Sequence, residues 1–179
     1  MSRLGEFRLI GNERGASVLI TAPHAFPPNS DKNTGRIAEQ AALMSGATAL
    51  IAMVSRKKID LNRGESEKHP FRKKIKEVIR FGRKPFLILD LHGMHTSGKR
   101  VEIGTDFGKS APNWVVELLA DTLAKHGVKV SINRKFAGSM KGTITSSYAE
   151  PIWHICNTVR TSCFYEGKAP DCQYRKNNL

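Results

Sequence analysis

A run of apolar residues ends abruptly in polar ones at residues 86–94, and this stretch most limits what the chain can fold into. Its letters are FLILDLHGM, and a Lys-Pro pair precedes it. An apolar run of this length, bounded by turn-forming residues, is typical of a fully buried strand in a parallel sheet. In open α/β sheets the ligand crevice lies beyond the carboxyl ends of the strands. His92 therefore marks either a candidate active site or the structural end of a core strand.

The composition is that of an ordinary globular protein with a strong positive charge. The chain has 179 residues, 40% of them hydrophobic, so we expect a single domain over residues 1–179. Twenty-nine Lys and Arg against 16 Asp and Glu give a formal net charge of +13, which suits an anionic partner. Nucleic acid is one such partner, but few aromatic residues lie among the basic clusters. Solvated basic faces are therefore the favoured interpretation.

The start of the chain and its cysteines bear on location. The first eight residues lack the apolar segment and cleavage site of a signal peptide, and no apolar stretch is long enough to span a bilayer. Cys156, Cys163 and Cys172 show no paired C-x-x-C spacing, so we expect neither a disulfide framework nor a cysteine zinc site. These features predict a cytoplasmic protein that has reduced thiols and does not bind membranes.

Strands and helices alternate along the chain up to about residue 150. Apolar runs predict strands over residues 5–10, 17–22, 49–54, 86–92, 100–104 and 128–133. Apolar residues at helical spacing predict helices over residues 32–45, 70–83 and 110–127. We expect Asp31 to be the N-cap of the first helix. The alternation predicts an α/β fold, in which a mostly parallel sheet has helices on both faces. From about residue 151 the pattern is lost, and this C-terminal tail is atypical.

Two histidines follow apolar strands, and a carboxylate lies between them in the sequence. His24 follows the strand over residues 17–22, His92 ends the strand over residues 86–92, and Asp31 precedes the first helix. Zinc favours such a ligand set, which leaves a fourth position for a water whose pKa falls toward about 7. Glu39 is a rival for the third ligand, but it lies two turns into the predicted helix and so farther from His24.

Polar residues near these histidines could support a site. Asp90 lies two residues before His92, so both side chains leave the same face of a regular strand. A carboxylate there can accept the second ring N–H of a metal-bound histidine, although a salt-bridged strand end is an equal alternative. Asn62 and Arg63 offer an amide beside a guanidinium, which suits capture of a carboxylate. An ordinary surface loop is the alternative for this pair.

Four motifs in order resemble the N-formylglutamate amidohydrolase family. They are A-P-H-A at residues 22–25, D-x-x-T at 31–34, S-R-K-K-I-D-L-N-R at 55–63 and D-L-H-G-M at 90–94. Later segments extend the resemblance to roughly residues 17–151. The family is related to zinc carboxypeptidases and aspartoacylases. The resemblance implies a three-layer α/β/α sandwich with a mostly parallel, mixed sheet, a phosphorylase/hydrolase-like fold.

The resemblance also implies a reaction and roles for these residues. His24 and His92 match the metal histidines of the family, Asp31 is the best match for the carboxylate ligand, and zinc is the implied cofactor. Asn62 and Arg63 match the pair that holds the substrate carboxylate in aspartoacylases. The implied function is metal-dependent hydrolysis of the amide bond in a small N-acyl amino acid or related anionic amide. A carboxypeptidase-like peptide hydrolase and a non-catalytic, basic nucleic-acid-binding protein on the same fold are the alternatives.

The general base of the family is the part that this sequence does not match. Family members usually carry a glutamate on a late strand, in the pattern apolar-Gln-apolar-Glu, and nothing after Pro151 fits it. Glu166 is the nearest substitute, with Glu150 and Glu102 behind it. Because the pattern is lost so abruptly, a second hypothesis is that the C-terminus is read out of frame relative to its relatives. Metal could then still bind while catalysis is impaired.

Overall fold

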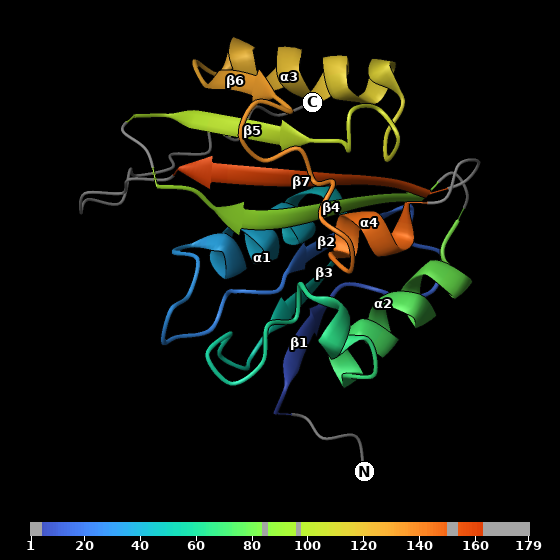
Figure 1. Ribbon diagram of the computed structural model, residues 1–179. Helices are drawn as coiled ribbons and strands as arrows, with labels where there is room; N and C mark the ends of the chain where they lie inside the picture. The colour runs from blue at the N-terminus through green and yellow to red at the C-terminus, as the bar shows by residue number, and fades with distance from the viewer. Residues whose placement is uncertain (1–4, 84–85, 96–97, 150–153, 163–179) are drawn as a thin grey trace, which may run out of the picture.

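The computed structural model describes residues 5–83, 86–95, 98–149 and 154–162, and within them a seven-stranded sheet organises the fold (Figure 1). The strands are β1 (Phe7–Ile10), β2 (Val18–Ala22), β3 (Thr48–Ala52), β4 (Phe86–Gly93), β5 (Arg100–Gly104), β6 (Lys129–Ile132) and β7 (His154–Ser162). Their order across the sheet is β1-β3-β2-β4-β7-β5-β6. Antiparallel pairing occurs between β1 and β3 and between β5 and β7, and the other neighbours are parallel. The predicted mixed, mostly parallel sheet is confirmed.

Helices cover both faces of this sheet, which gives the three layers that the sequence predicts (Figure 1). The helices are α1 (Thr34–Ser45), α2 (Pro70–Phe81), α3 (Asn113–Lys125) and α4 (Ile144–Tyr148), and a 3-10 turn spans Gly64–Ser66. Residues of α1 and α3 pack on one face, and residues of α2 and α4 pack on the other. No helix within the described residues combines the length and the apolarity that crossing a bilayer requires.

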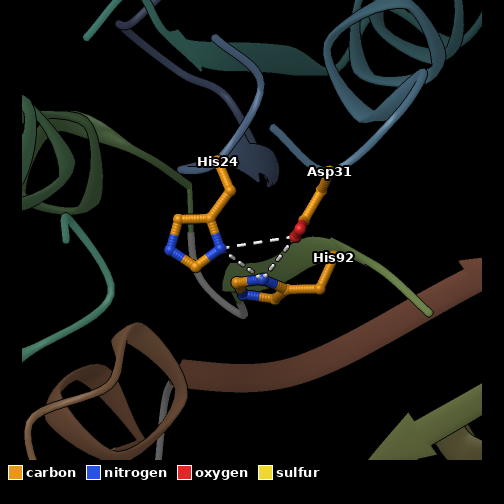
Figure 2. Close-up of side chains that lie close together, drawn as sticks. All are labelled: His24, Asp31 and His92. Carbon is orange, nitrogen blue, oxygen red and sulfur yellow. Dashed lines mark hydrogen bonds and ion pairs between the residues drawn. The ribbon is translucent and has the colours of Figure 1, made fainter. Parts of the chain in front are cut away.

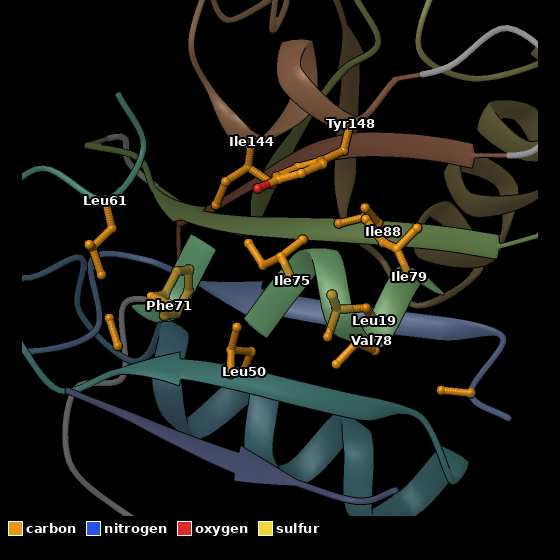
Figure 3. Close-up of a cluster of buried hydrophobic side chains, with 12 residues drawn as sticks. Leu19, Leu50, Leu61, Phe71, Ile75, Val78, Ile79, Ile88, Ile144 and Tyr148 are labelled. Carbon is orange, nitrogen blue, oxygen red and sulfur yellow. The ribbon is translucent and has the colours of Figure 1, made fainter. Parts of the chain in front are cut away.

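The face under α2 and α4 holds the larger apolar side chains (Figure 3). Phe71, Ile75 and Val78 of α2 are fully buried and pack with Leu50 and Ile88 of the sheet. Burying one such side chain stabilises the fold by about 1.5 to 3 kcal/mol. The helical spacing of these residues predicted this packing. The opposite face is lined by smaller residues, including Ala38 and Ala42 of α1.

The beginning of α1 differs from the prediction. Asn33 is the N-cap and adopts a left-handed conformation with φ of 65°, and its side chain makes no capping hydrogen bond. Asp31 lies two residues earlier, where its backbone carbonyl accepts a hydrogen bond from Thr34 Oγ1 at 2.9 Å. The prediction that Asp31 is the N-cap is therefore wrong, and its carboxylate points elsewhere.

Strand β7 lies inside the tail for which the sequence shows no regular pattern. It is nonetheless a central strand, since it pairs with β4 on one side and with β5 on the other. The atypical tail therefore supplies an inner strand of the sheet through residue 162. The alternation of strands and helices extends farther along the chain than predicted.

The start of α2 makes stability depend on pH. The N-cap residue His69 accepts a hydrogen bond at Nδ1 from the backbone N–H of Phe71, at 3.2 Å, which requires that nitrogen to be unprotonated. Burial lowers the pKa of His69; Glu6 raises it in part, and Lys58 lowers it further. The unfolded chain therefore binds more protons, so this contribution to stability is full above about pH 6.5 and is lost as the pH falls below it.

We expect His69→Ala to cost about 1 kcal/mol of unfolding free energy at pH 7, the usual value of an N-cap, and clearly less at pH 5. Urea denaturation at the two pH values measures this difference. His69→Asn, which keeps a capping acceptor that does not titrate, is expected to remain close to the wild type at pH 7. An equal cost of the alanine variant at both pH values would contradict the capping role.

Candidate metal centre

Three side chains from separate segments converge at the carboxyl ends of β2 and β4 (Figure 2). His24 lies in the turn after β2, Asp31 precedes α1, and His92 lies near the end of β4. The Nδ1 atoms of the two imidazoles are 3.2 Å apart. Oδ2 of Asp31 lies 3.3 Å from His24 Nδ1 and 3.2 Å from His92 Nδ1. Both histidines are buried, with exposed fractions of 3% and 1%.

These separations fit the donor atoms of a tetrahedral ion. With bonds of about 2.0 to 2.1 Å, two zinc ligands at the tetrahedral angle lie about 3.3 to 3.4 Å apart. The three edges of the triangle are 3.2, 3.2 and 3.3 Å. Nitrogen, nitrogen and carboxylate oxygen are also the donors that zinc accepts. The residues present therefore fit a zinc ion in donor type and in the distances between their donor atoms.

The outer ring nitrogens show which tautomers the histidines adopt. His24 Nε2 lies 2.7 Å from Asp60 Oδ1, and His92 Nε2 lies 2.9 Å from Asp90 Oδ2. Because an ionised carboxylate only accepts hydrogen bonds, these two contacts favour a proton on each Nε2 atom. In neutral imidazoles the Nδ1 lone pairs then face Asp31, and three acceptors converge. Such an arrangement requires a cation at its centre, or additional protons.

The two supporting carboxylates differ in how the sequence reveals them. Asp90 is completely buried and also accepts a hydrogen bond of 2.6 Å from Thr21 Oγ1 of the adjacent strand. Its contact with His92 is the one predicted from their spacing. Asp60 supports His24 in the same way, and this contact was not predicted from the sequence. The available signal was its place immediately before Leu61 and Asn62, in a loop that follows a strand end.

Asp31 is held as an anion in a tight space. Burial by itself raises the pKa of Asp31, but hydrogen bonds from the two imidazoles, in the form in which Nδ1 carries an additional proton, outweigh it and hold that pKa well below its usual range. Arg56 approaches the other oxygen, Oδ1, at 3.4 Å. Gly93 makes the close approach possible, because a Cβ atom there would lie 3.0 Å from the Asp31 Cβ. A charged carboxylate is what a metal ion requires of this ligand.

Asp60 is also kept ionised. Burial raises its pKa, and this is outweighed by the hydrogen bond and the charge of His24, by the backbone N–H of Asn62 and by the charge of Arg63. Arg56 bridges the two carboxylates of the site, since its Nη2 atom lies 3.7 Å from Asp60 Oδ2. The site therefore contains three carboxylates, of which two share a guanidinium.

Asn62 and Arg63 lie beside the histidines. Asn62 is buried, and its Oδ1 accepts a hydrogen bond of 2.7 Å from the backbone N–H of Ile144. This bond turns the amide nitrogen of Asn62 toward His92 Nε2, which lies 2.9 Å from it. Arg63 is partly exposed, and both residues line a cavity of about 170 Å³.

The remaining predicted carboxylates lie apart from the three converging side chains. Glu39 forms an ion pair of 2.6 Å with Arg8, so Asp31 and not Glu39 joins the histidines. Glu102 accepts hydrogen bonds from the backbone N–H groups of Lys135 and Phe136. The predicted general base, Glu166, and the substitute at residue 150 lie outside the described residues.

Several solved structures have a similar architecture. An N-formylglutamate amidohydrolase from Ralstonia eutropha JMP134 superposes with a TM-score of 0.67 at 14% identity, over 88% of this chain and 86% of that one. A bacteriophage poly-gamma-glutamate hydrolase gives a TM-score of 0.58 at 9% identity, over 89% and 73%. A zinc-free form of YNDL gives 0.51 at 14% identity, over 87% and 71%. These likenesses show that this chain and the three solved structures share one fold.

The sequence itself identifies the family. The profile of the N-formylglutamate amidohydrolase family matches residues 69–158, half of the chain. The protein therefore belongs to the N-formylglutamate amidohydrolase family, as the motifs predicted. A comparison with curated protein sequences gives no match.

Proposed function

We propose that this protein is a zinc-dependent amidohydrolase that cleaves the amide bond of a small N-acyl amino acid or a related anionic amide. The observation that carries the proposal is the convergence of three acceptor atoms, two imidazole Nδ1 and one carboxylate oxygen, at mutual distances of 3.2 to 3.3 Å. Membership of the amidohydrolase family supports the reaction class.

In this proposal His24, Asp31 and His92 hold the ion. When bound, zinc would polarise the amide carbonyl and increase the acidity of a water molecule. Asp60 and Asp90 keep the proton of each imidazole on Nε2, so that Nδ1 remains free to bind the metal. Loss of either carboxylate would release its ring to rotate or to change tautomer.

Arg63 and Asn62 provide the proposed substrate contacts. The guanidinium of Arg63 lines the 170 Å³ cavity beside Asn62, whose amide also approaches His92. A planar guanidinium binds a carboxylate through two parallel hydrogen bonds. The carboxylate of an N-acyl amino acid held there would place its amide close to the metal ligands. Because the oxygen of Asn62 already accepts a hydrogen bond from Ile144, Asn62 would contact the substrate through its amide N–H groups.

The proposed general base is Glu166. The backbone register places Arg160 of β7 beside His92, and the described part of β7 contains no glutamate, so the acid must come from elsewhere. Glu102 is a weaker candidate, because one of its oxygens already accepts two backbone N–H groups. If the reading frame of the C-terminus is altered, we expect metal binding with impaired catalysis.

Zinc analysis combined with hydrolysis assays tests this function. We expect one zinc ion per chain after purification without chelators, hydrolysis of N-formyl or N-acetyl amino acids, and loss of that hydrolysis on removal of zinc. Peptides with a free C-terminus, tested in parallel, would reveal a carboxypeptidase-like activity instead. Zinc binding without hydrolysis of any of these amides would refute the catalytic proposal and leave the metal site standing. Absence of zinc binding would refute both.

A further inference from the structure

A second cavity, of about 530 Å³, lies over β5 and β6 and is lined mainly by basic side chains. Its charged residues are Arg100, Glu102, Lys129, Arg134 and Lys135, together with His95. Four of them are permanent cations and one is a carboxylate. A cavity of this size lies within the range of small-ligand sites, which is about 300 to 1,000 Å³.

Strand alternation explains why charges gather on this face of the sheet. Val101 and Ile103 of β5 point into the core beneath α3. Arg100 and Glu102, which alternate with them, must leave the opposite face. The register pairs Arg100 with Lys129 and Glu102 with Ser131, so the two strands present one continuous polar surface there.

The one carboxylate of the cavity is already engaged. Glu102 is 4% exposed and accepts hydrogen bonds from the backbone N–H groups of Lys135 and Phe136. This fixes the loop after β6, which carries Arg134 and Lys135 on the rim. Gly104 allows the same loop to come close, because a Cβ atom there would lie 2.3 Å from the carbonyl oxygen of Phe136. The basic rim is therefore held in place by the sheet.

This basic cavity lies next to the candidate metal centre. His92 pairs with Arg160 of β7, and Arg160 pairs with Glu102 of β5, so His92 and Glu102 share one row and one face of the sheet. Two strand spacings separate them, which corresponds to about 10 Å. Lys135 lines both the basic cavity and the 170 Å³ cavity that contains Arg63. The two cavities are thus neighbours.

We propose that the basic cavity is a second anion site, which binds a further carboxylate of the substrate held at the metal centre. Arg63 suffices for one carboxylate, whereas Glu102, which lies among the cations of the basic cavity, is about 10 Å from His92 across the sheet. An extended peptide advances about 3.3 to 3.6 Å per residue, so the second carboxylate belongs about three residues from the reacting amide. The preferred substrate class is then a short acidic N-acyl peptide. This inference rests on the proposed function for the identity of the reacting group.

Binding of a short acidic peptide tests the second site without any reaction. The probe is triglutamate, titrated calorimetrically into the whole protein at low salt. The double variant K129Q/R134Q removes two cations of the cavity, and we expect its dissociation constant to rise about tenfold, since each charge-assisted contact contributes a few-fold. The matched variant K73Q/R80Q removes one exposed Lys and one exposed Arg from α2. We expect it to bind within about twofold of the wild type.

Hydrolysis assays separate failure of this inference from failure of the proposed function. The wild type is expected to have a lower KM for N-formyl-triglutamate than for N-formylglutamate, and K129Q/R134Q is expected to lose that difference without a change in kcat. If neither compound is hydrolysed but the double variant still weakens triglutamate binding, the proposed function fails and the second site stands. Equal triglutamate binding by both double variants would overturn the site. A single-stranded oligonucleotide of equal charge is the alternative ligand. If it binds more tightly than triglutamate and K129Q/R134Q weakens that binding, the cavity is a nucleic-acid site, and the proposed carboxylate site is overturned.

Discussion

His92→Ala is expected to abolish stoichiometric zinc binding and to reduce amide hydrolysis to background. The variant would leave only His24 Nδ1 and Asp31 Oδ2 as protein donors, at 3.3 Å from each other. Binding of zinc by four protein ligands contributes about 10 to 16 kcal/mol, so each ligand accounts for about 3 kcal/mol. Loss of one ligand then weakens zinc binding by a factor on the order of 10². Metal analysis after dialysis and competition with a chromogenic chelator measure this change.

Two further variants control for nonspecific effects of the substitution. His126→Ala removes an exposed histidine at the end of α3, where its ring contacts the carbonyl of Thr122, and we expect no change in zinc content. Asp60→Asn keeps all three donor atoms and removes only the carboxylate that supports His24. We expect it to weaken zinc binding by about 10 to 100-fold, less than or equal to loss of a ligand. Full zinc content in His92→Ala would show that the metal lies elsewhere.

Arg72→Met is expected to destabilise the fold by about 2 to 4 kcal/mol. Arg72 is 1% exposed, and its guanidinium donates to the carbonyls of Leu61 and Gly142 and to Tyr148 Oη, at 3.2 to 3.3 Å. It also lies 5.0 Å from the centre of the Tyr148 ring. Methionine fills much of the same volume but leaves these acceptors buried without a donor, at a cost of about 1 to 3 kcal/mol each. Part of that cost is offset because the variant no longer has to bury a charged guanidinium.

Urea denaturation of Arg72→Met measures this loss. Arg80→Met on the same helix is the matched control, because Arg80 is exposed and a surface substitution usually changes stability by no more than about 0.5 kcal/mol. Leu61 lies between Asp60 and Asn62, so the bond from Arg72 also fixes the loop that supports His24. If the urea midpoint of Arg72→Met equals that of the wild type, the cost of removing the Arg72 guanidinium from water is as large as the stabilisation that its hydrogen bonds provide.

Most of the fold was predictable because its signals are local. The strands at residues 18–22 and 86–93 and the helix at residues 70–81 follow directly from apolar runs and helical spacing. Strand β7 was not predictable in this way, because its letters HICNTVRTS mix polar and apolar residues without the continuous run of a buried parallel strand. Its place depends on partners that lie 50 or more residues earlier in the sequence.

The site was predictable where strand ends determine position, and less so where loops do. His24 and His92 each follow an apolar run in the sequence, and they meet because β2 and β4 are parallel neighbours. The hidden members were Asp60, which comes from a loop, and Arg72, which looks like one more cation in a basic run of α2. Asp31 lies with the two histidines as grouped from the sequence, and only its predicted role as the N-cap is wrong, since Asn33 is the N-cap. Contacts between distant segments decide these cases, and a linear pattern does not contain them.

The central position of β7 has a consequence for the order of folding. Strands β1 to β4 can pair once residue 93 has left the ribosome, and β5 and β6 can pair with each other. Among the strands of the described residues, only β7 joins the two groups. Contacts between segments so distant in sequence form late, because closing a long loop costs entropy before any contact compensates it. All three candidate metal ligands lie in the first group, and the cations of β5 and β6 lie in the second. The nascent chain can therefore assemble its metal ligands before the basic cavity is brought alongside them.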